Sequence, residues 1–246
     1  MGFYPRRPVD RPVIMSKTRI LNWFDWFLIL GTTLVSIVSS LLGEGWDTLG
    51  FIVAVTGIVN LVLCARGNIW NYIFGIIYNA IYVYISWKSR LYADSAIYLL
   101  YYLPMQFVGW FSWKKNQNQD SGAVNVQHLN KRMALLLLVA AAVLIPTFAW
   151  VLGLPAIGDS QPWLDATTTV VSILAMYMMV KAIAEQWYIW IALDAMQVVK
   201  WAIATIQGEE HAALMLVMFA FFLANAVYGL IQWNRLAKQA SAQPQP

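Results

Sequence analysis

The sequence predicts an all-α integral membrane protein with eight transmembrane helices, in which one extra N-terminal span precedes a duplicated core of three helices, a linker helix and three helices. Of its 246 residues, 60% are hydrophobic and 11% are charged, whereas a soluble domain carries about 25% charged residues. The mean hydropathy is +0.59. This composition excludes an ordinary cytosolic enzyme, a disordered chain and a disulfide-stabilised secreted scaffold. Two further observations predict this fold class: a succession of apolar runs along the chain and an internal repeat.

Apolar runs of about 20 residues, long enough to cross a bilayer, follow one another along the chain. Runs free of charge cover 26–43, 48–65, 67–87, 95–113, 133–158, 166–180 and 212–234. An eighth run, 186–207, is equally apolar but contains Asp194 and Lys200, whose burial in a membrane is costly. The predicted organisation is an N-terminal tail (1–22), an extra span (23–43), a first three-helix repeat (47–113), a linker (114–130), a linker helix (131–153), a second three-helix repeat (163–233) and a C-terminal tail (234–246).

Basic residues are divided unequally between the two sides of the predicted membrane. With eight spans and a cytoplasmic N-terminus, the inside segments hold 13 Lys and Arg residues, and the outside loops hold only Lys88 and Arg90. This bias predicts that both termini are cytoplasmic. We therefore attribute the net charge of +4 to basic residues that orient the chain in the membrane, and we expect no nucleic-acid partner. The N-terminal segment lacks the apolar core and cleavage site of a signal peptide.

An offset of 120 residues superposes the chain on itself at three positions. It pairs Trp70 with Trp190, and the ends Gly109–Trp113 and Gly229–Trp233 coincide without a gap. Because one span lies between the two triplets, both triplets have the same orientation, and the repeat is parallel. Parallel repeats belong to a transporter plan in which the substrate lies near the midplane between the halves.

Neutral amides from four spans fall near the middle of the bilayer when depth is counted at 1.5 Å per residue. They are Asn79, Gln106, Gln197 and Asn225. Lipid does not tolerate such a layer on the outer face of a bundle, so we expect these side chains to point inward. The alternative is that each amide binds a neighbouring helix and only holds the bundle together.

Aromatic rings and one acid accompany the amides. Tyr102 precedes Gln106 by one turn, and Trp187, Trp190 and Asp194 follow one another at about one-turn spacing. Amides donate and accept hydrogen bonds, rings stack and attract cations, and an acid balances a positive charge or accepts from hydroxyls. The eight residues predict a binding site for a small, flat, polar molecule.

Other candidate residues are assigned structural roles. Trp87, Trp113 and Trp233 lie at span ends and are predicted to belong to the interfacial aromatic belt. Pro104 predicts a kink beside the site. The two histidines have no second ligand nearby, so no metal site is expected. A nucleophile with a base is also missing, so neither a catalytic residue nor a cofactor is expected.

Motifs in both halves resemble those of the PnuC family of bacterial vitamin transporters, typified by nicotinamide riboside uptake. The first half contains N-I-W-N at 68–71, Gly75, R-L-Y-A-D at 90–94 and G-W-F-S-W at 109–113. The second half contains D-x-x-T-T at 165–169 and W-x-x-W, at Trp187 and Trp190, followed by Asp194. The resemblance covers about 48–233 and implies a fold of three helices, a linker helix and three helices, like a fused relative of the sugar-transporting SWEET proteins.

The resemblance also implies a function. It is the uptake of unphosphorylated nicotinamide riboside by facilitated diffusion across the bacterial inner membrane, with phosphorylation by a cytoplasmic riboside kinase trapping the product. The W-x-x-W pair and neighbouring polar residues would line the substrate path. A related carrier for thiamin, flavin or a sugar is the alternative, and a membrane receptor or enzyme is a further one. Association into a homo-oligomer is left open.

Overall fold

The computed structural model describes residues 21–42, 46–90, 92–118, 121–155, 157, 161–208 and 212–242, with the backbone only for 93, 94 and 240–242. The first 20 residues of the predicted N-terminal tail, with five of the basic residues assigned to the inside, lie outside this range. The helices are α1 (Trp23–Leu42), α2 (Thr48–Ala65), α3 (Asn71–Lys88), α4 (Tyr92–Ile97), the π-helix η1 (Tyr98–Tyr102), α5 (Leu103–Lys115), α6 (Lys131–Leu152), α7 (Pro162–Val180), α8 (Gln186–Ile206) and α9 (Ala212–Ala242).

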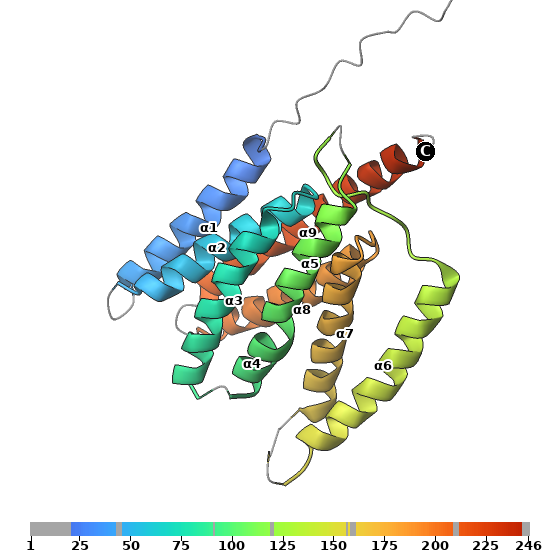
Figure 1. Ribbon diagram of the computed structural model, residues 1–246. Helices are drawn as coiled ribbons and strands as arrows, with labels where there is room; N and C mark the ends of the chain where they lie inside the picture. The colour runs from blue at the N-terminus through green and yellow to red at the C-terminus, as the bar shows by residue number, and fades with distance from the viewer. Residues whose placement is uncertain are drawn as a thin grey trace, which may run out of the picture.

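The predicted all-α class is confirmed in the described residues, where β pairing is limited to two isolated bridges. Within the described part of the chain, six helices are long and apolar enough to cross a membrane, namely α1, α2, α6, α7, α8 and α9. The helix α3 and the continuous stretch α4–η1–α5 occupy the two remaining predicted positions. The protein is therefore a helical, multi-pass membrane protein (Figure 1).

The last helix is longer than predicted. We expected the C-terminal tail to begin at 234, but α9 continues to Ala242. The added residues include Ala, Leu, Lys, Arg and Gln, which are strong helix formers. Ala237 is buried and Leu236 packs against the core, so tertiary contacts also support this extension.

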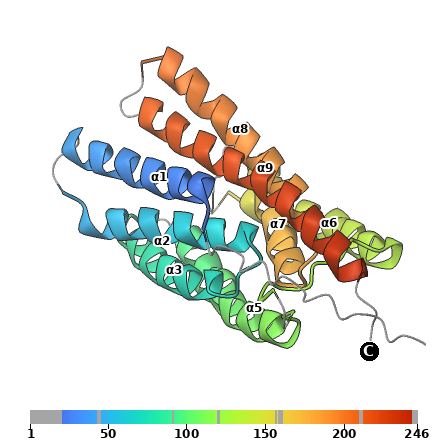
Figure 2. The ribbon, with the colours of Figure 1, turned by 90° about the horizontal axis from the view of Figure 1, so that it is seen from above.

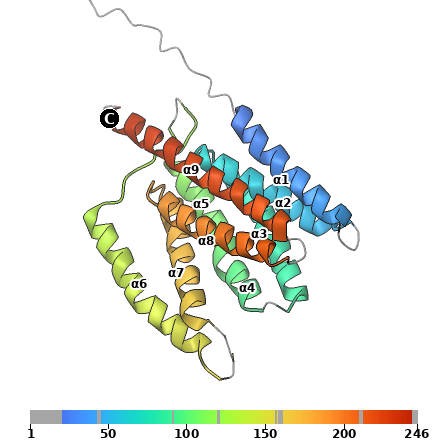
Figure 3. The ribbon, with the colours of Figure 1, turned by 180° about the vertical axis from the view of Figure 1, so that it is seen from behind.

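The helices form two groups that meet along two seams. In one group α3 packs against α2 and α5, and in the other α8 packs against α7 and α9. The groups meet where α2 contacts α9 and where α5 contacts α7. The linker helix α6 lies at the edge against α7, and α1 lies on α2 and α9 (Figures 1 and 2). The start of α1, the α5–α6 connection and the end of α9 lie on the same side of the molecule (Figures 1 and 3).

The turns after α2 and α7 have the same hydrogen-bonded geometry. Gly67 has φ +64° and Ala182 has φ +53°; their N–H groups donate to Cys64 O at 2.8 Å and Met179 O at 2.9 Å. The next N–H in each turn also donates back into the helix: Asn68 N donates to Leu63 O and Ile183 N donates to Met178 O, both at 2.9 Å. This is the Schellman pattern, which satisfies the last carbonyls of a helix. The chain reverses after each turn, so that α3 packs against α2 and α8 packs against α7.

The 120-residue offset does not describe these turns. Because Ala182 matches Gly67, the residue that matches Trp70 is Glu185 and not Trp190. Trp70 is exposed and precedes α3, whereas Trp190 lies inside α8 and packs against the core. The ends Trp113 and Trp233, in contrast, do make equivalent contacts, described below.

The polar linker between α5 and α6 joins both turns. The N–H of Val124 donates to Gly67 O at 2.9 Å, and the N–H of Gln127 donates to Ala182 O at 2.9 Å. Gln127 O accepts from Ala184 N at 3.0 Å. Val124 and Val126 are buried. The linker is therefore a packed segment that joins the two groups at the turns after α2 and α7.

A buried ion pair attaches α1 to the rest of the bundle. Asp25 of α1 is fully buried and pairs with the guanidinium of Arg66, the residue that caps α2. Arg66 also lies 5.5 Å from the ring centre of Tyr228 on α9, and Asn22 Nδ2 donates to Tyr228 Oη at 3.1 Å. Because α2 and α9 belong to different groups, α1 bridges one of the two seams.

Candidate substrate-binding site

Four aromatic rings form a continuous floor between the two groups. Tyr72 and Trp113 have ring centres 5.0 Å apart, Trp113 and Trp233 5.6 Å, and Trp233 and Trp187 5.7 Å. We name these four residues the aromatic floor. Each ring is at most 2% exposed. The prediction that Trp113 and Trp233 lie in the interfacial belt is therefore wrong, because their rings turn into the bundle, whereas Trp87 is 61% exposed as a belt residue would be.

The two central tryptophans are fixed by equivalent hydrogen bonds across the seams. Trp113 Nε1 donates to Met179 O at 3.0 Å, and Trp233 Nε1 donates to Cys64 O at 2.9 Å. Each acceptor lies in the last turn of the first helix of the opposite group. Each bond also satisfies an indole N–H that would otherwise be buried without a partner.

Two glycines make room for the outer rings of the floor. A Cβ at Gly109 of α5 would collide with the ring of Tyr72, and a Cβ at Gly229 of α9 would lie 2.6 Å from ring atoms of Trp187. No real side chain reaches such separations, so both positions require glycine for this close approach. The glycines thus determine how closely α5 and α9 approach α3 and α8.

Four polar side chains lie at one level above the aromatic floor. Asn79 and Asp194 follow Tyr72 and Trp187 by seven residues, Gln106 precedes Trp113 by seven, and Asn225 precedes Trp233 by eight. At 1.5 Å per residue, the backbone position of each of the four is about 10–12 Å along its helix from the floor residue of the same helix. We name them the polar layer. Two members come from each group of helices, so the layer spans the space between the groups.

Two amides of the polar layer hold unpaired acceptors. Gln106 and Asn225 are 5% and 1% exposed, and Gln106 Oε1 and Asn225 Oδ1 have no hydrogen-bond partner among the described residues. A buried polar atom without a partner costs about 1–3 kcal/mol. By contrast, Asn79 Nδ2 donates to Gly75 O at 2.6 Å. Gln106 and Asn225 are therefore the members of the layer whose acceptors are available to a bound molecule.

Asn60 on α2 is a polar neighbour that the sequence reasoning missed. Its Nδ2 donates to Asn71 O at 2.7 Å, and both Asn60 Nδ2 and Gln106 Oε1 would contact a Cβ at Gly75. Gly75 therefore leaves space for an amide from α2 and another from α5 against α3. The available signal was a single asparagine within an otherwise apolar run, 48–65.

The remaining predicted residues on α8 lie at different heights. Trp187 belongs to the floor, and its buried Nε1 has no hydrogen-bond partner in the part of the chain that the structure describes. Trp190 lies about one turn further and donates from Nε1 to Gln186 Oε1 at 3.3 Å. Gln197 follows Asp194 by three residues and is partly exposed, so it lies outside the polar layer. Lys200 is exposed, with its ammonium 5.2 Å from the ring centre of Trp201.

Tyr102 is held by a bond across the α5–α7 seam. Its hydroxyl donates to Ser172 Oγ at 2.9 Å, and Tyr101 Oη donates to Ile173 O at 2.7 Å. Both tyrosines belong to the π-helix η1, which ends two residues before Pro104. Proline lacks an N–H and interrupts the helical ladder, and π-helical turns often occur at functional sites. The predicted irregularity at Pro104 thus takes the form of a π-helix.

The arrangement suits the binding of a small polar molecule, because amide oxygens, indole N–H groups, aromatic rings and one carboxylate occur on helices of both groups. In the described ranges no three His, Cys, Asp or Glu side chains gather to hold a metal ion. A multi-pass bundle with a polar layer between two packed groups of helices belongs to the class of membrane transporters.

Residues 47–235 match the sequence model of the nicotinamide mononucleotide transporter family, so the chain belongs to that family and is a transporter, not an enzyme. The resemblance to PnuC proteins is confirmed. A "Nicotinamide riboside transporter PnuC" from Neisseria mucosa is 36% identical over 204 residues, which cover 81% of this chain and 76% of that protein. Proteins of the same name from Haemophilus influenzae and Escherichia coli are 35% and 26% identical, and cover 80% and 82% of this chain and 83% and 92% of their own.

A solved structure has the same fold. It is described as "Crystal structure of the Vitamin B3 transporter PnuC", and it superposes with a TM-score of 0.71 at 32% sequence identity. The superposition covers 89% of this chain and 94% of that chain. Sequence and structure therefore lead to the same family.

Proposed function

We propose that this protein takes up nicotinamide riboside by facilitated diffusion, and that phosphorylation by a cytoplasmic riboside kinase then traps the substrate. The names of the relatives, all at least 26% identical over about four-fifths of this chain, support the choice of substrate. The residues proposed to contact it are Asn79, Tyr102, Gln106, Trp187, Trp190, Asp194, Gln197 and Asn225, with the polar layer at the centre.

The unpaired acceptors of Gln106 and Asn225 are the observation that carries this proposal. Both are amide oxygens buried at the same level on opposite groups of helices. They require hydrogen-bond donors, and the riboside offers the N–H groups of its carboxamide and the hydroxyls of its ribose. The unpaired N–H of Trp187 requires an acceptor, which the carboxamide oxygen can supply. Substrate binding would therefore satisfy groups that the empty bundle leaves unpaired.

Charge favours the riboside over its phosphorylated form. The pyridinium ring of the riboside is a cation, which aromatic faces attract and which the carboxylate of Asp194 would balance. A phosphate would instead bring negative charge close to Asp194. The cation of α8, Lys200, lies over Trp201 on an exposed face and about two turns from the polar layer. We therefore infer that the mononucleotide binds more weakly than the riboside.

We infer a duplicated core of three helices, a linker helix and three helices, with eight spans in total. Three pairs of features support it: the two Schellman turns, the contacts α2–α9 and α5–α7, and the bonds from Trp113 and Trp233 to the opposite group. A twofold axis that passes between Trp113 and Trp233 would exchange the two members of each pair. Alternating access would then proceed by movement of one group against the other.

The proposed orientation places both termini in the cytoplasm of a bacterium, with the protein in the inner membrane. The division of basic residues, 13 inside and two outside, supports it. A tag at either end should be accessible only from the cytoplasmic side. In spheroplasts, labelling of a cysteine introduced at Lys88 but not at Lys114 would support this orientation, and the reverse pattern would contradict it.

Uptake into liposomes tests the proposed function. Purified protein is reconstituted without ATP or an ion gradient, and influx of labelled nicotinamide riboside is measured. We expect saturable influx that stops when inner and outer concentrations are equal, and continued accumulation when a riboside kinase and ATP are enclosed.

Competing compounds identify the cargo in the same assay. Unlabelled riboside should compete strongly, and the mononucleotide, thiamin, riboflavin and a hexose should compete weakly. Absence of saturable riboside influx would overturn the proposal. Stronger competition by thiamin or riboflavin would assign the carrier to that vitamin instead, and accumulation above equilibrium without a kinase would exclude facilitated diffusion.

A further inference from the structure

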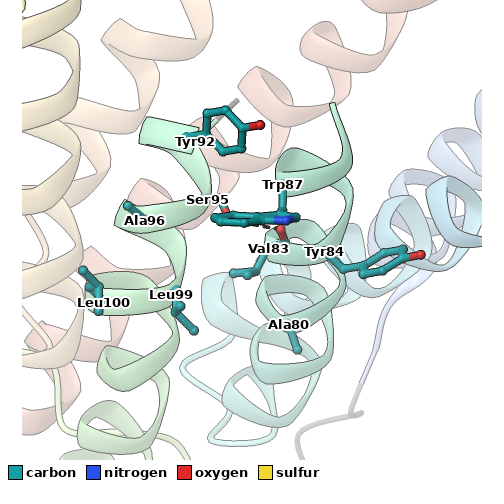
Figure 4. A pocket seen from close by; sticks show the side chains of 9 residues that line it. All are labelled: Ala80, Val83, Tyr84, Trp87, Tyr92, Ser95, Ala96, Leu99 and Leu100. Atoms are coloured by element: carbon teal, nitrogen blue, oxygen red, sulfur yellow. Dashed lines mark hydrogen bonds between the residues drawn. The ribbon is translucent and has the colours of Figure 1, made fainter. Parts of the chain in front are cut away.

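A laterally open groove lies between α3 and the consecutive elements α4 and η1, and its lining includes none of the four residues of the polar layer. It has a volume of about 450 Å³, and its lining residues are Ala80, Val83, Tyr84, Trp87, Tyr92, Ser95, Ala96, Leu99 and Leu100. The indole of Trp87 lies across the gap between the two helices, with Tyr92 above it and Val83 below it (Figure 4). We name this feature the α3–α4 groove.

The lining of the groove is compatible with hydrocarbon. The one hydroxyl at its base, Ser95 Oγ, donates to Val83 O at 3.1 Å and is 97% removed from solvent as a residue, so it needs no other partner. The walls are large apolar side chains that remain exposed, with Leu99 at 49% and Leu100 at 75%. In a membrane, a surface of this kind contacts lipid chains and not water.

One end of the groove is placed at the membrane interface by its aromatic rings. Trp87 and Tyr92 meet edge to face with centres 5.1 Å apart, and both are more than half exposed. Amphipathic rings of this type concentrate at the level of the lipid headgroups. Ala80 lies seven residues from Trp87 on α3, so the groove extends about 10 Å from the interface into the hydrocarbon.

Two exposed cations stand at this interfacial end. Lys88 follows Trp87 directly, with its ammonium 5.7 Å from the ring centre of Tyr84, and Arg90 follows two residues later. They are the two basic residues that the sequence assigns to the outside loops, where the positive-inside bias disfavours them. The segment 88–94 also contains Asp94, and its net charge is positive. Membrane insertion alone does not explain two cations at this position.

The backbone at Arg90 gives a second indication that the cation has a role. Arg90 has φ +61°, in the left-handed region where glycine is favoured after a helix. An arginine here costs stability that a glycine would not. Residues held in such conformations often serve a function.

We propose that the α3–α4 groove binds an anionic phospholipid, with one acyl chain along the groove and the headgroup phosphate on Lys88 and Arg90. The guanidinium and ammonium groups donate charge-assisted hydrogen bonds to phosphate oxygens. The apolar walls bury the chain, and Trp87 and Tyr92 fix the depth of the headgroup. The lipid would then fill the space between α3 and α4, directly behind the tyrosines of η1.

Native mass spectrometry of the purified protein with phosphatidylglycerol or phosphatidylcholine tests this proposal. We expect the wild type to retain at least about fivefold more phosphatidylglycerol than phosphatidylcholine. The double variant K88Q/R90Q should retain both lipids equally. The matched control K114Q/K115Q removes two exposed lysines from the last turn of α5, outside the groove. This control should behave as the wild type. Equal retention of the two lipids by the wild type, or equal losses in the two double variants, would overturn the proposal.

Two single variants separate the headgroup contact from the groove. Arg90→Gly relieves the left-handed strain, so we expect a higher unfolding temperature without lipid together with loss of the additional stabilisation by phosphatidylglycerol. Ala96→Trp fills the groove and should lower retention of both lipids. If Ala96→Trp instead changes the oligomeric mass and leaves lipid retention unaltered, the groove is an interface between copies of the chain and the lipid proposal is wrong.

Discussion

The rings of Trp113 and Trp233 meet between the two groups of helices, with centres 5.6 Å apart and planes inclined at 56°. Each indole N–H donates to a carbonyl at the end of the first helix of the opposite group, Met179 O or Cys64 O. One pair of side chains therefore joins both seams at the same level.

Replacing either central tryptophan by phenylalanine keeps a ring but removes its N–H bond. We expect Trp113→Phe and Trp233→Phe each to lower the free energy of unfolding by about 1–2 kcal/mol, by similar amounts because the two bonds are equivalent. Thermal and denaturant unfolding in detergent measure this loss. Trp150→Phe, at a 69% exposed position on α6, is the control and should change stability little. A loss confined to one of the two central variants would contradict their equivalence.

Adding one methyl group to Gly109 of α5 or Gly229 of α9 should push that helix away from the ring that packs against the glycine. Gly109→Ala and Gly229→Ala place a Cβ into the rings of Tyr72 and Trp187, and overpacking of this kind costs about 1–3 kcal/mol. We expect lower unfolding temperatures and weaker riboside binding. Val227→Ala, at an exposed position on α9, is the control. Unchanged stability in both alanine variants would mean that the helices separate freely at these points.

Removing the unpaired amide of Gln106 should separate binding from stability. Because Gln106 Oε1 has no partner, Gln106→Met should leave the empty protein as stable as the wild type or more stable. Riboside binding, measured by calorimetry, should weaken about 2- to 10-fold through the lost hydrogen bond. The same result is expected for Asn225→Leu.

Asn60→Leu is the matched control for the amides, because the Asn60 side chain already donates to Asn71 O. Its replacement should lower stability. If Gln106→Met loses as much stability as Asn60→Leu and binds riboside normally, Gln106 holds helices together and does not bind substrate.

Breaking the ion pair between α1 and α2 should destabilise the bundle strongly. Asp25 is fully buried and Arg66 is 20% exposed in its side chain, so Asp25→Asn or Arg66→Gln leaves a buried group unpaired at a cost of about 3–5 kcal/mol. The double variant should lose less than the sum of the two, as a double-mutant cycle on unfolding free energies will measure. His128→Gln breaks a more exposed pair with Glu185 and should cost less than about 1 kcal/mol. Additive losses would show that Asp25 and Arg66 act independently.

Much of the fold was predictable because hydropathy and charge are local properties. The eight predicted runs correspond to helical stretches in the structure, with most ends displaced by a few residues. The larger displacements are at α6, which ends at Leu152 where the apolar run continues to 158, and at α9, which continues to Ala242 where the run ends at 234. The amides Gln106 and Asn225 were identified because a polar side chain in an apolar run must find an environment inside the bundle. Asn60 was missed because its importance depends on Gly75 and Gln106, which belong to other helices.

The sequence predicts a repeat from the matching ends of α5 and α9, but the hydrogen bonds of the two turns do not support the pairing of Trp70 with Trp190. A constant offset ignores insertions within a repeat, and only the hydrogen bonds of the two turns relate Gly67 to Ala182. Likewise, position at the end of a span could not distinguish Trp87, which is exposed, from Trp113 and Trp233, which are buried.

The sequence by itself determined the membrane class, the approximate limits of the helices and the family. These features depend on the transfer of each segment between water and lipid, which is a sum over neighbouring residues. Only the tertiary structure decided which aromatic rings form the floor, that the polar linker joins both turns, and that Asp25 of α1 pairs with Arg66. Those relationships depend on the direction of side chains across helix contacts, and residues far apart in the sequence meet there only when the whole bundle packs.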